Sequence, residues 1–159
     1  MEQKTRHPKL EHLESLVGEW ETEATHPYIP DTVIRGRATF EWLEGGFFLI
    51  WRSHHDHPDL PDGIAILGCG DPERAGTSSD SEGDCQLHYF DSRGVSRVYG
   101  LDGQKGVWRL WRDWPGFWQR SVCTVSADGD TMTFGAEFSR DGTTWEPDLH
   151  VSYRRVGRG

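Results

Sequence analysis

Histidines gather in one short stretch of the sequence, where their side chains could bind a metal ion. His54, His55 and His57 fall within the run Ser53-His54-His55-Asp56-His57, and on an extended strand His55 and His57 point to the same face. Imidazoles at this spacing occur in zinc and iron sites. A complete site needs three or four converging ligands, however, and Pro58 indicates that the chain leaves its strand here. We therefore interpret the stretch as a solvated rim and predict no metal site.

Tryptophans and arginines alternate between Trp108 and Arg120. Such a pattern can stack on nucleic-acid bases, but 26 acidic and 17 basic side chains give the chain a net charge of −9, which repels phosphates and anionic lipids. We therefore expect no nucleic-acid or membrane partner. Structural packing of arginine stems on indole rings is the favoured interpretation. Trp108, Arg112 and Arg120 are nevertheless candidates for contact with an acidic or aromatic ligand where they face inward.

The segment around His88 presents two faces of mixed polarity. One face carries Gln86, His88 and Phe90, and the other carries Cys85, Leu87 and Tyr89. A ligand cavity combines apolar walls with a few hydrogen-bonding groups, so this mixture suits a partly polar lumen. We predict that His88, Phe90 and Trp51 contact a ligand there. The alternative for His88 is a structural histidine bonded to a neighbouring strand.

Motifs of the common enzyme classes do not occur in the sequence. It contains no Gly-x-Ser-x-Gly elbow, no phosphate-binding glycine loop, no dinucleotide fingerprint and no His-Glu-x-x-His zinc motif. An enzyme acting inside a lumen would need an inward acid or base whose pKa is shifted toward neutrality by burial. The sequence identifies no such pair and leaves open whether the protein is an enzyme.

Short apolar runs separated by glycine-containing turns make up most of the chain, and connections such as Asp102-Gly103 are typical of hairpins. A long antiparallel meander removes its exposed edges when its first and last strands pair. We therefore predict an all-β fold, a single closed up-and-down barrel of about ten strands, with a two-sheet sandwich as the alternative. The predicted strands are 18–26, 33–43, 47–55, 63–69, 85–91, 95–101, 106–113, 118–126, 131–139 and 144–156.

The whole of 1–159 is expected to form one domain. Leucines at helical spacing after Pro8 predict a short helix within residues 1–16 that covers one end of it. Residues 71–84 have almost no apolar side chains and are expected to form a flexible surface loop.

The cysteines and the apolar segments bear on where the protein resides. Cys69, Cys85 and Cys123 are odd in number and lack zinc-like spacing, and no apolar leader or membrane span is present. We therefore expect a soluble, cytoplasmic protein.

Two motifs at the ends of the predicted barrel resemble those of the calycin superfamily of lipocalins and fatty-acid-binding proteins. Gly18-Glu19-Trp20 follows the short helix and opens the first strand, and Tyr153-Arg154-Arg155 lies in the last. The resemblance implies a lipocalin-like barrel in which Trp20 plugs one end and Arg154 or Arg155 lies across its indole. We assign this closing role to Trp20 and Arg154.

Longer segments are most similar to a family of bacterial calycin-like proteins of unknown function. They are GRATFEWLEGG (36–46), HYFDSRGVSRVY (88–99), WRLWRDWPGFWQR (108–120) and DGTTWEPDLHVSYRRV (141–156). The similarity extends over almost the whole chain. These segments lie largely in turns and packing positions, so the resemblance concerns the fold rather than an activity.

A more distant resemblance to the nitrobindins implies haem as an alternative cofactor. Nitrobindins bind haem through a histidine near the start of the last strand, and His150 has a comparable place in this chain. Leu149, Val151 and Tyr153 nevertheless make the more natural core face of that strand. If they face inward, His150 lies outside the barrel.

The leading hypothesis is an intracellular barrel, monomeric or homodimeric, that binds a hydrophobic or aromatic small molecule without a cofactor. The alternatives are a haem-binding, nitrobindin-like protein with His150 as the iron ligand, and a cofactor-free isomerase or cyclase acting on a small metabolite in the lumen.

Overall fold

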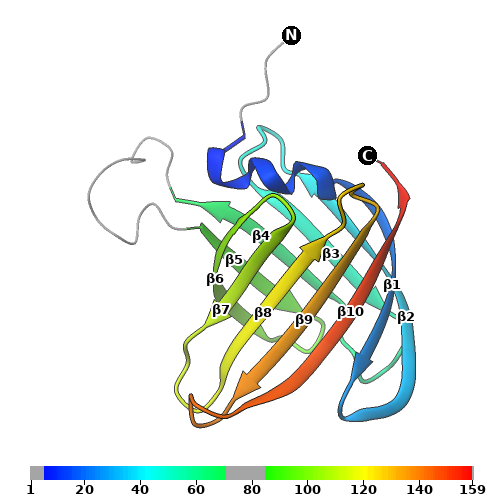
Figure 1. Cartoon of the computed structure of the whole chain (residues 1–159), viewed down its shortest axis with the longest axis vertical. Helices are drawn as coiled ribbons and strands as arrows, with labels where there is room; N and C mark the ends of the chain where they lie inside the picture. The colour runs from blue at the N-terminus through cyan, green and yellow to red at the C-terminus, as the bar shows by residue number, and fades with distance from the viewer. Residues whose placement is uncertain (1–5, 71–84, 159) are drawn as a thin grey trace.

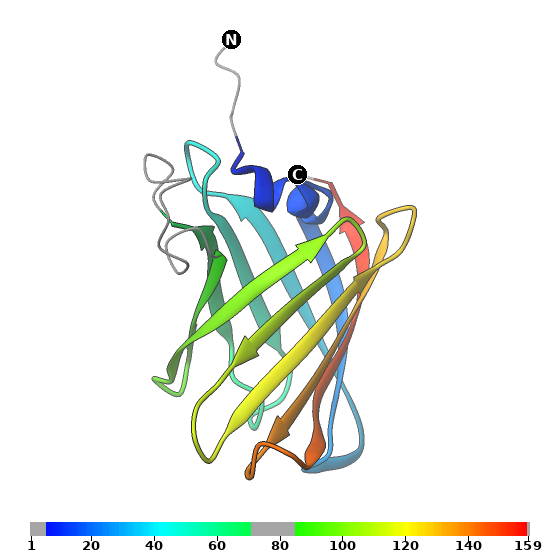
Figure 2. The ribbon, with the colours of Figure 1, turned by 60° about the vertical axis from the view of Figure 1, so that its left-hand side comes forward.

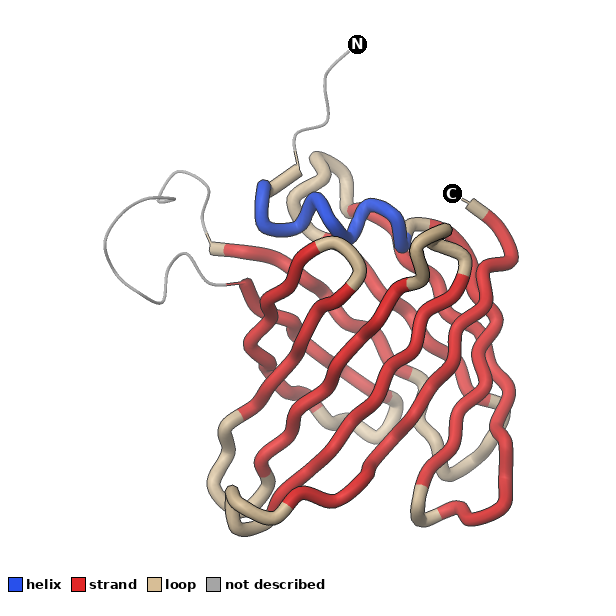
Figure 3. Tube along the Cα trace, viewed as in Figure 1, coloured by secondary structure: helices blue, strands red, loops and turns tan. Residues whose placement is uncertain are grey.

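Ten antiparallel strands and one short helix make up the computed structural model, which describes residues 6–70 and 85–158. The elements are η1 (Pro8–Leu16), β1 (Gly18–His26), β2 (Ile29–Trp42), β3 (Leu49–His55), β4 (Gly63–Cys69), β5 (Cys85–Asp91), β6 (Ser96–Gln104), β7 (Val107–Arg112), β8 (Trp118–Val125), β9 (Thr131–Ser139) and β10 (Trp145–Gly157). Each strand pairs with its neighbours in sequence, and β1 also pairs with β10, which closes the barrel (Figures 1 and 3). The predicted all-β, up-and-down barrel is confirmed.

The predicted strand boundaries agree with the observed ones to within a few residues, and the largest difference is at the start of β2. This strand begins at Ile29 rather than at residue 33, directly after a turn at Pro27 and Tyr28. Its partner β3 pairs only with Gly36–Trp42. The first half of β2 therefore borders one strand, β1, and such an edge tolerates Pro30.

Alternation along β1 gives the barrel its inner and outer surfaces. Trp20, Thr22 and Ala24 are buried, whereas the three glutamates between Gly18 and Thr25 are exposed. Side chains on a strand point alternately to its two faces, so the glutamates lie in solvent while the indole enters the interior. The expected orientation of this strand is confirmed.

Helix η1 covers one end of the barrel, as Figures 1 and 2 show. It is a 3₁₀ helix, in which residues three apart lie on one face. Leu10, Leu13 and Leu16 have this spacing and are fully buried. Large buried side chains fill the barrel beneath them: Trp20, Phe40, Leu49, Leu67, Trp108 and Met132. This end of the barrel is therefore closed and packed.

Cys69 and Cys85 lie opposite each other on β4 and β5 and form a disulfide, while Cys123 is a buried free thiol whose pKa is raised by that burial. The cysteine count alone could not reveal this pairing, because the two residues meet only when the strands do. The loop predicted at 71–84 lies outside the described residues. Within the described part of the chain, no helix has the length and apolar character needed to cross a bilayer.

Candidate ligand-binding site

The end of the barrel opposite η1 is hollow. A cavity of about 590 Å³ opens there, among the ends of the strands and the loops that join them, and this volume falls within the range of small-molecule sites. Its apolar and aromatic lining includes Trp51, Ala65, Leu87, Tyr89, Tyr99, Leu110, Phe134, Phe138, Leu149, Val151 and Tyr153. One barrel thus combines a packed end with an open one.

Trp51 separates the cavity from the packed core. Its ring stacks on Phe40 at a centroid distance of 5.1 Å and meets the edge of Trp108 at 5.7 Å, both of them core residues. Toward the cavity it contacts Phe134 and Tyr153, at 6.1 and 6.3 Å. The indole nitrogen Nε1 is buried and has no hydrogen-bond partner among the described residues. Trp51 therefore contributes its ring to the aromatic wall, while its N–H lies enclosed in the protein.

His55 is the second residue of the cavity wall that has a buried polar atom without a hydrogen-bond partner among the described residues. It lies on the same face of β3 as Trp51, lines the cavity, and is only 9% exposed. Burial lowers the pKa of its imidazole, an effect that the negative charge of Asp62 opposes. The ring is thus neutral at pH 7, and its Nδ1 has no partner among the described residues. A buried polar atom without a hydrogen bond costs about 1–3 kcal/mol.

The two tyrosine hydroxyls of the lining that come from β5 and β6 are already hydrogen-bonded. The Tyr89 hydroxyl donates to Asp91 at 2.7 Å, and Arg93 donates to the same carboxylate at 2.7 Å. Burial raises the pKa of Asp91, but these hydrogen bonds outweigh it and bring the value to about 2. Tyr99 donates to Gln119 Oε1 at 3.2 Å. These tyrosines contribute rings of fixed orientation to the wall.

A histidine–aspartate pair lies beside the entrance. The Nδ1 atom of His26 accepts the backbone N–H of Tyr28, so Nε2 carries the hydrogen that is donated to Asp148 at 2.9 Å. Both ring nitrogens of His26 are therefore occupied. The pair joins β1 to β10 at the mouth and leaves no free imidazole nitrogen for a substrate.

Of the residues predicted to contact a ligand, Trp51 lines the cavity. Trp108 faces inward but lies in the packed core behind Trp51. Arg112, at the end of β7, stacks on Trp114 at 4.9 Å and lies outside the cavity lining. The remaining three are on the outer surface.

His88 and Phe90 are exposed on the outer face of β5, which corrects the prediction that they line the lumen. Leu87 and Tyr89 take the inner face because Cys85, on the same face, belongs to the buried core. Arg120 is likewise exposed on the outer face of β8, where it pairs with Glu137 at 3.2 Å.

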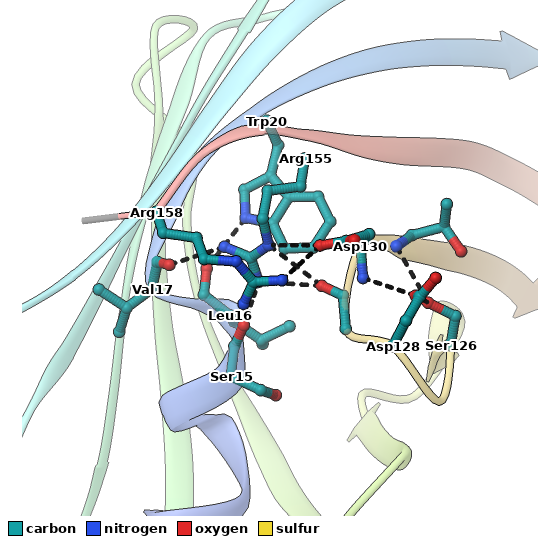
Figure 4. Close-up of polar contacts among 11 residues, drawn as sticks. Ser15, Leu16, Val17, Trp20, Ser126, Asp128, Asp130, Arg155 and Arg158 are labelled. Atoms are coloured by element: carbon teal, nitrogen blue, oxygen red, sulfur yellow. Dashed lines mark hydrogen bonds and ion pairs between the residues drawn. The ribbon is translucent and has the colours of Figure 1, made fainter.

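Arg155, rather than the predicted Arg154, closes the packed end (Figure 4). Its guanidinium lies 4.3 Å from the centroid of the Trp20 ring and donates to the carbonyls of Ser15, Val17 and Gly129. The Trp20 indole itself donates to the Leu16 carbonyl at 2.9 Å.

The register between β1 and β10 explains this correction. Trp20 pairs with Arg155, whereas Arg154 pairs with Glu21 on the outer face and forms an ion pair with it. Strand alternation allows only one of two consecutive arginines to reach the indole.

The predicted haem ligand does not fit the structure. His150 is exposed on the outer face of β10, opposite Thr25 of β1, while Val151 and Tyr153 face the lumen. Its imidazole therefore cannot reach a group held inside the barrel.

The histidine-rich stretch is also divided between surfaces. His54 lies on the outer surface, between Asp56 and Asp62 at 2.8 and 2.9 Å, and these contacts raise its pKa. His55 faces the lumen instead. No group of three or more His, Cys, Asp or Glu side chains in 6–70 and 85–158 is arranged to hold a metal ion.

Several lining residues were missed by the sequence analysis, among them His55, Tyr89, Tyr99, Arg97 and Arg140. The alternation of β5 carried a usable signal, since placing Leu87 inside also places Tyr89 inside. No comparable local signal marks the arginines, which reach the cavity from its rim.

Comparison with known proteins supports the fold alone. No protein family and no curated protein sequence matches the chain. Among solved structures, it is similar to the crystal structure of Rv2717c from M. tuberculosis, with a TM-score of 0.59 and 16% sequence identity over 96% of this chain and 99% of that one. The likeness shows a shared fold, which in this chain is a closed ten-stranded barrel.

Proposed function

We propose that this chain is a calycin-like barrel that binds a small hydrophobic or aromatic molecule in the cavity opposite η1. The observation that carries the proposal is the cavity of about 590 Å³, whose wall consists of apolar and aromatic side chains with a few polar ones among them. An apolar or aromatic body would cover these rings, and the polar side chains of the lining would orient it.

Trp51 and His55 both line the cavity, and their spacing indicates its length along the barrel. They are four residues apart on one face of β3, which corresponds to roughly 13 Å along a strand. Trp51 lies against the packed core, and His55 is at the end of the strand nearer the mouth. An elongated or multi-ring molecule matches this distance better than a compact one.

Binding can be tested with N-phenyl-1-naphthylamine, a neutral aromatic probe whose fluorescence rises in apolar sites. We expect saturable 1:1 binding to the wild type. Ala136→Trp, which places an indole in the lumen from β9, should abolish binding. Thr133→Trp, on the exposed face of the same strand, is the matched control and should bind normally.

Folding of each variant is checked by circular dichroism and thermal unfolding. If Ala136→Trp does not fold, Gln119→Trp places an indole in the same cavity from β8. Equal binding by the wild type and a folded lumen variant would refute the proposal, as would the absence of binding to the wild type.

A further inference from the structure

Two arginines at the mouth of the cavity lie on a pair of touching aromatic rings. The guanidinium of Arg97, from β6, is 5.5 Å from the centroid of Phe117, and that of Arg140, just after β9, is 5.8 Å from Phe138. The two rings are themselves 5.5 Å apart. All four side chains line the cavity. The two cations therefore share one edge of the entrance.

The acidic groups of the lining contact residues other than Arg97 and Arg140. Asp148 bonds His26 at 2.9 Å, Glu137 bonds Arg120 at 3.2 Å, and Asp59 lies 4.0 Å from His57. The third arginine of the mouth, Arg93, is paired with Asp91.

By contrast, no ion pair joins Arg97 or Arg140 to a carboxylate in the part of the chain that the structure describes. Within the described residues, Arg97 and Arg140 are thus two cations at the entrance with no ion-pair partner, although Asp59 and Asp148 also line the cavity beside histidines and the chain as a whole carries −9.

We propose that the ligand is an aromatic anion whose acid group binds Arg97 and Arg140 at the mouth while its rings enter the lumen toward Trp51. This inference rests on the proposed function and names the class of ligand. A guanidinium offers forked N–H donors that match a carboxylate or sulfonate, and such charge-assisted hydrogen bonds are about twice as strong as neutral ones. Arg97 is half-buried and Arg140 exposed, so the acid group keeps part of its hydration.

The contact of each guanidinium with a ring prepares this site. An arginine that is held against an aromatic ring loses less side-chain freedom when it binds an anion. The overall negative charge repels anions at long range, so the attraction comes from these two local groups. An anion with no apolar body would gain little from the lumen and should bind weakly.

Two probes with one aromatic skeleton provide the test. The first, 8-anilino-1-naphthalenesulfonate, is N-phenyl-1-naphthylamine with a sulfonate added, and both fluoresce on binding to apolar sites. We would titrate each into the wild type, the single variants Arg97→Gln and Arg140→Gln, and the double variant. Arg37→Gln, an exposed arginine of β2, controls for the change in net charge.

The wild type is expected to bind the sulfonate more tightly than the neutral probe. Kd for the sulfonate should rise about tenfold in the double variant, while Kd for the neutral probe changes less than about twofold, the difference expected from losing charge-assisted hydrogen bonds. Arg37→Gln should alter neither Kd. If the double variant does not fold, the two single variants give the same comparison, each with a smaller rise in Kd for the sulfonate.

Equal loss of both probes, or a sulfonate affinity that ignores the two arginines, would overturn the anion assignment and leave the binding barrel intact. If neither probe binds the wild type, the proposed function itself fails. The two failures are therefore distinguishable.

Discussion

Consecutive arginines in the last strand have different roles, which a pair of substitutions should separate. Arg155 packs on Trp20 and donates to three backbone carbonyls, whereas Arg154 is largely exposed. We predict that Arg155→Ala lowers the free energy of unfolding by about 2–3 kcal/mol, because it removes charge-assisted hydrogen bonds and a cation–π contact. Arg154→Ala should lower it by less than about 1 kcal/mol. Urea denaturation measures both values.

Equal effects of the two substitutions would contradict this assignment of roles. From the sequence alone, either arginine could be the one that lies across the tryptophan in calycins, since both follow Tyr153. Only the register with β1 decides between them.

Adjacent histidines are predicted to affect acid stability in opposite directions. Burial lowers the pKa of His55 in the folded state, so its contribution to stability is complete above the unfolded pKa of about 6.5 and is lost as the pH falls. Hydrogen bonds from the His54 ring to the Asp62 and Asp56 carboxylates raise the pKa of His54, so its contribution is complete below that value and is lost as the pH rises.

His55→Gln should therefore reduce the loss of stability between pH 7 and pH 5, and His54→Gln should increase it. Denaturant unfolding at a series of pH values measures both differences from the wild type. Slopes that change in the same direction for the two variants would contradict the assignment of one ring to the lumen and the other to solvent.

Helix η1 is predicted to contribute to the stability of the whole barrel. Its three leucines are fully buried against the core. Replacing one of them leaves a cavity beneath the helix, so Leu13→Ala should lower the free energy of unfolding by about 2–5 kcal/mol. Glu11→Ala, on the exposed side of the same helix, should change it by less than about 0.5 kcal/mol. A near-neutral Leu13→Ala in thermal and urea unfolding would show that this end does not depend on the helix.

The elements of this fold were largely predictable because their signals are local. Alternation is unambiguous in β1, where every outward residue between Gly18 and Thr25 is glutamate. It fails in β5, where His88 and Phe90 are as compatible with a lumen as Leu87 and Tyr89 are. There the inward face is the one that carries Cys85, which packs in the buried core with residues of other strands. The sequence of β5 alone does not reveal those contacts.

The barrel as a whole is divided into a packed half and a hollow half. The large side chains of the packed half surround Trp20 and Trp108, and the hollow half begins at Trp51. A molecule that binds only the folded state raises its stability by mass action, by about 2.7 kcal/mol at a hundred times Kd. Ligand-dependent stability is therefore the expected signature of the hollow half.

Closure explains why the site was harder to predict than the fold. The arginines at the entrance come from β6 and from the connection after β9, and the rings that hold them come from the β7–β8 connection and from β9. Apart from Phe138 and Arg140, these segments are distant in sequence, and they meet at the rim of the closed barrel. The sequence predicts a barrel with a lumen. Which side chains line the lumen and its entrance depends on the register between strands that are distant in sequence.

The indole N–H resonances of the eight tryptophans report directly whether a ligand lies in the lumen. We would record ¹H–¹⁵N correlation spectra while titrating 8-anilino-1-naphthalenesulfonate, with Trp51→Phe used for assignment. The Nε1–H of Trp51 should shift most, because the Trp51 ring lines the cavity, while that of Trp20, bonded to Leu16 at the packed end, should hardly move. Large shifts at the exposed Trp111 and Trp114, with Trp51 unchanged, would contradict binding in the lumen.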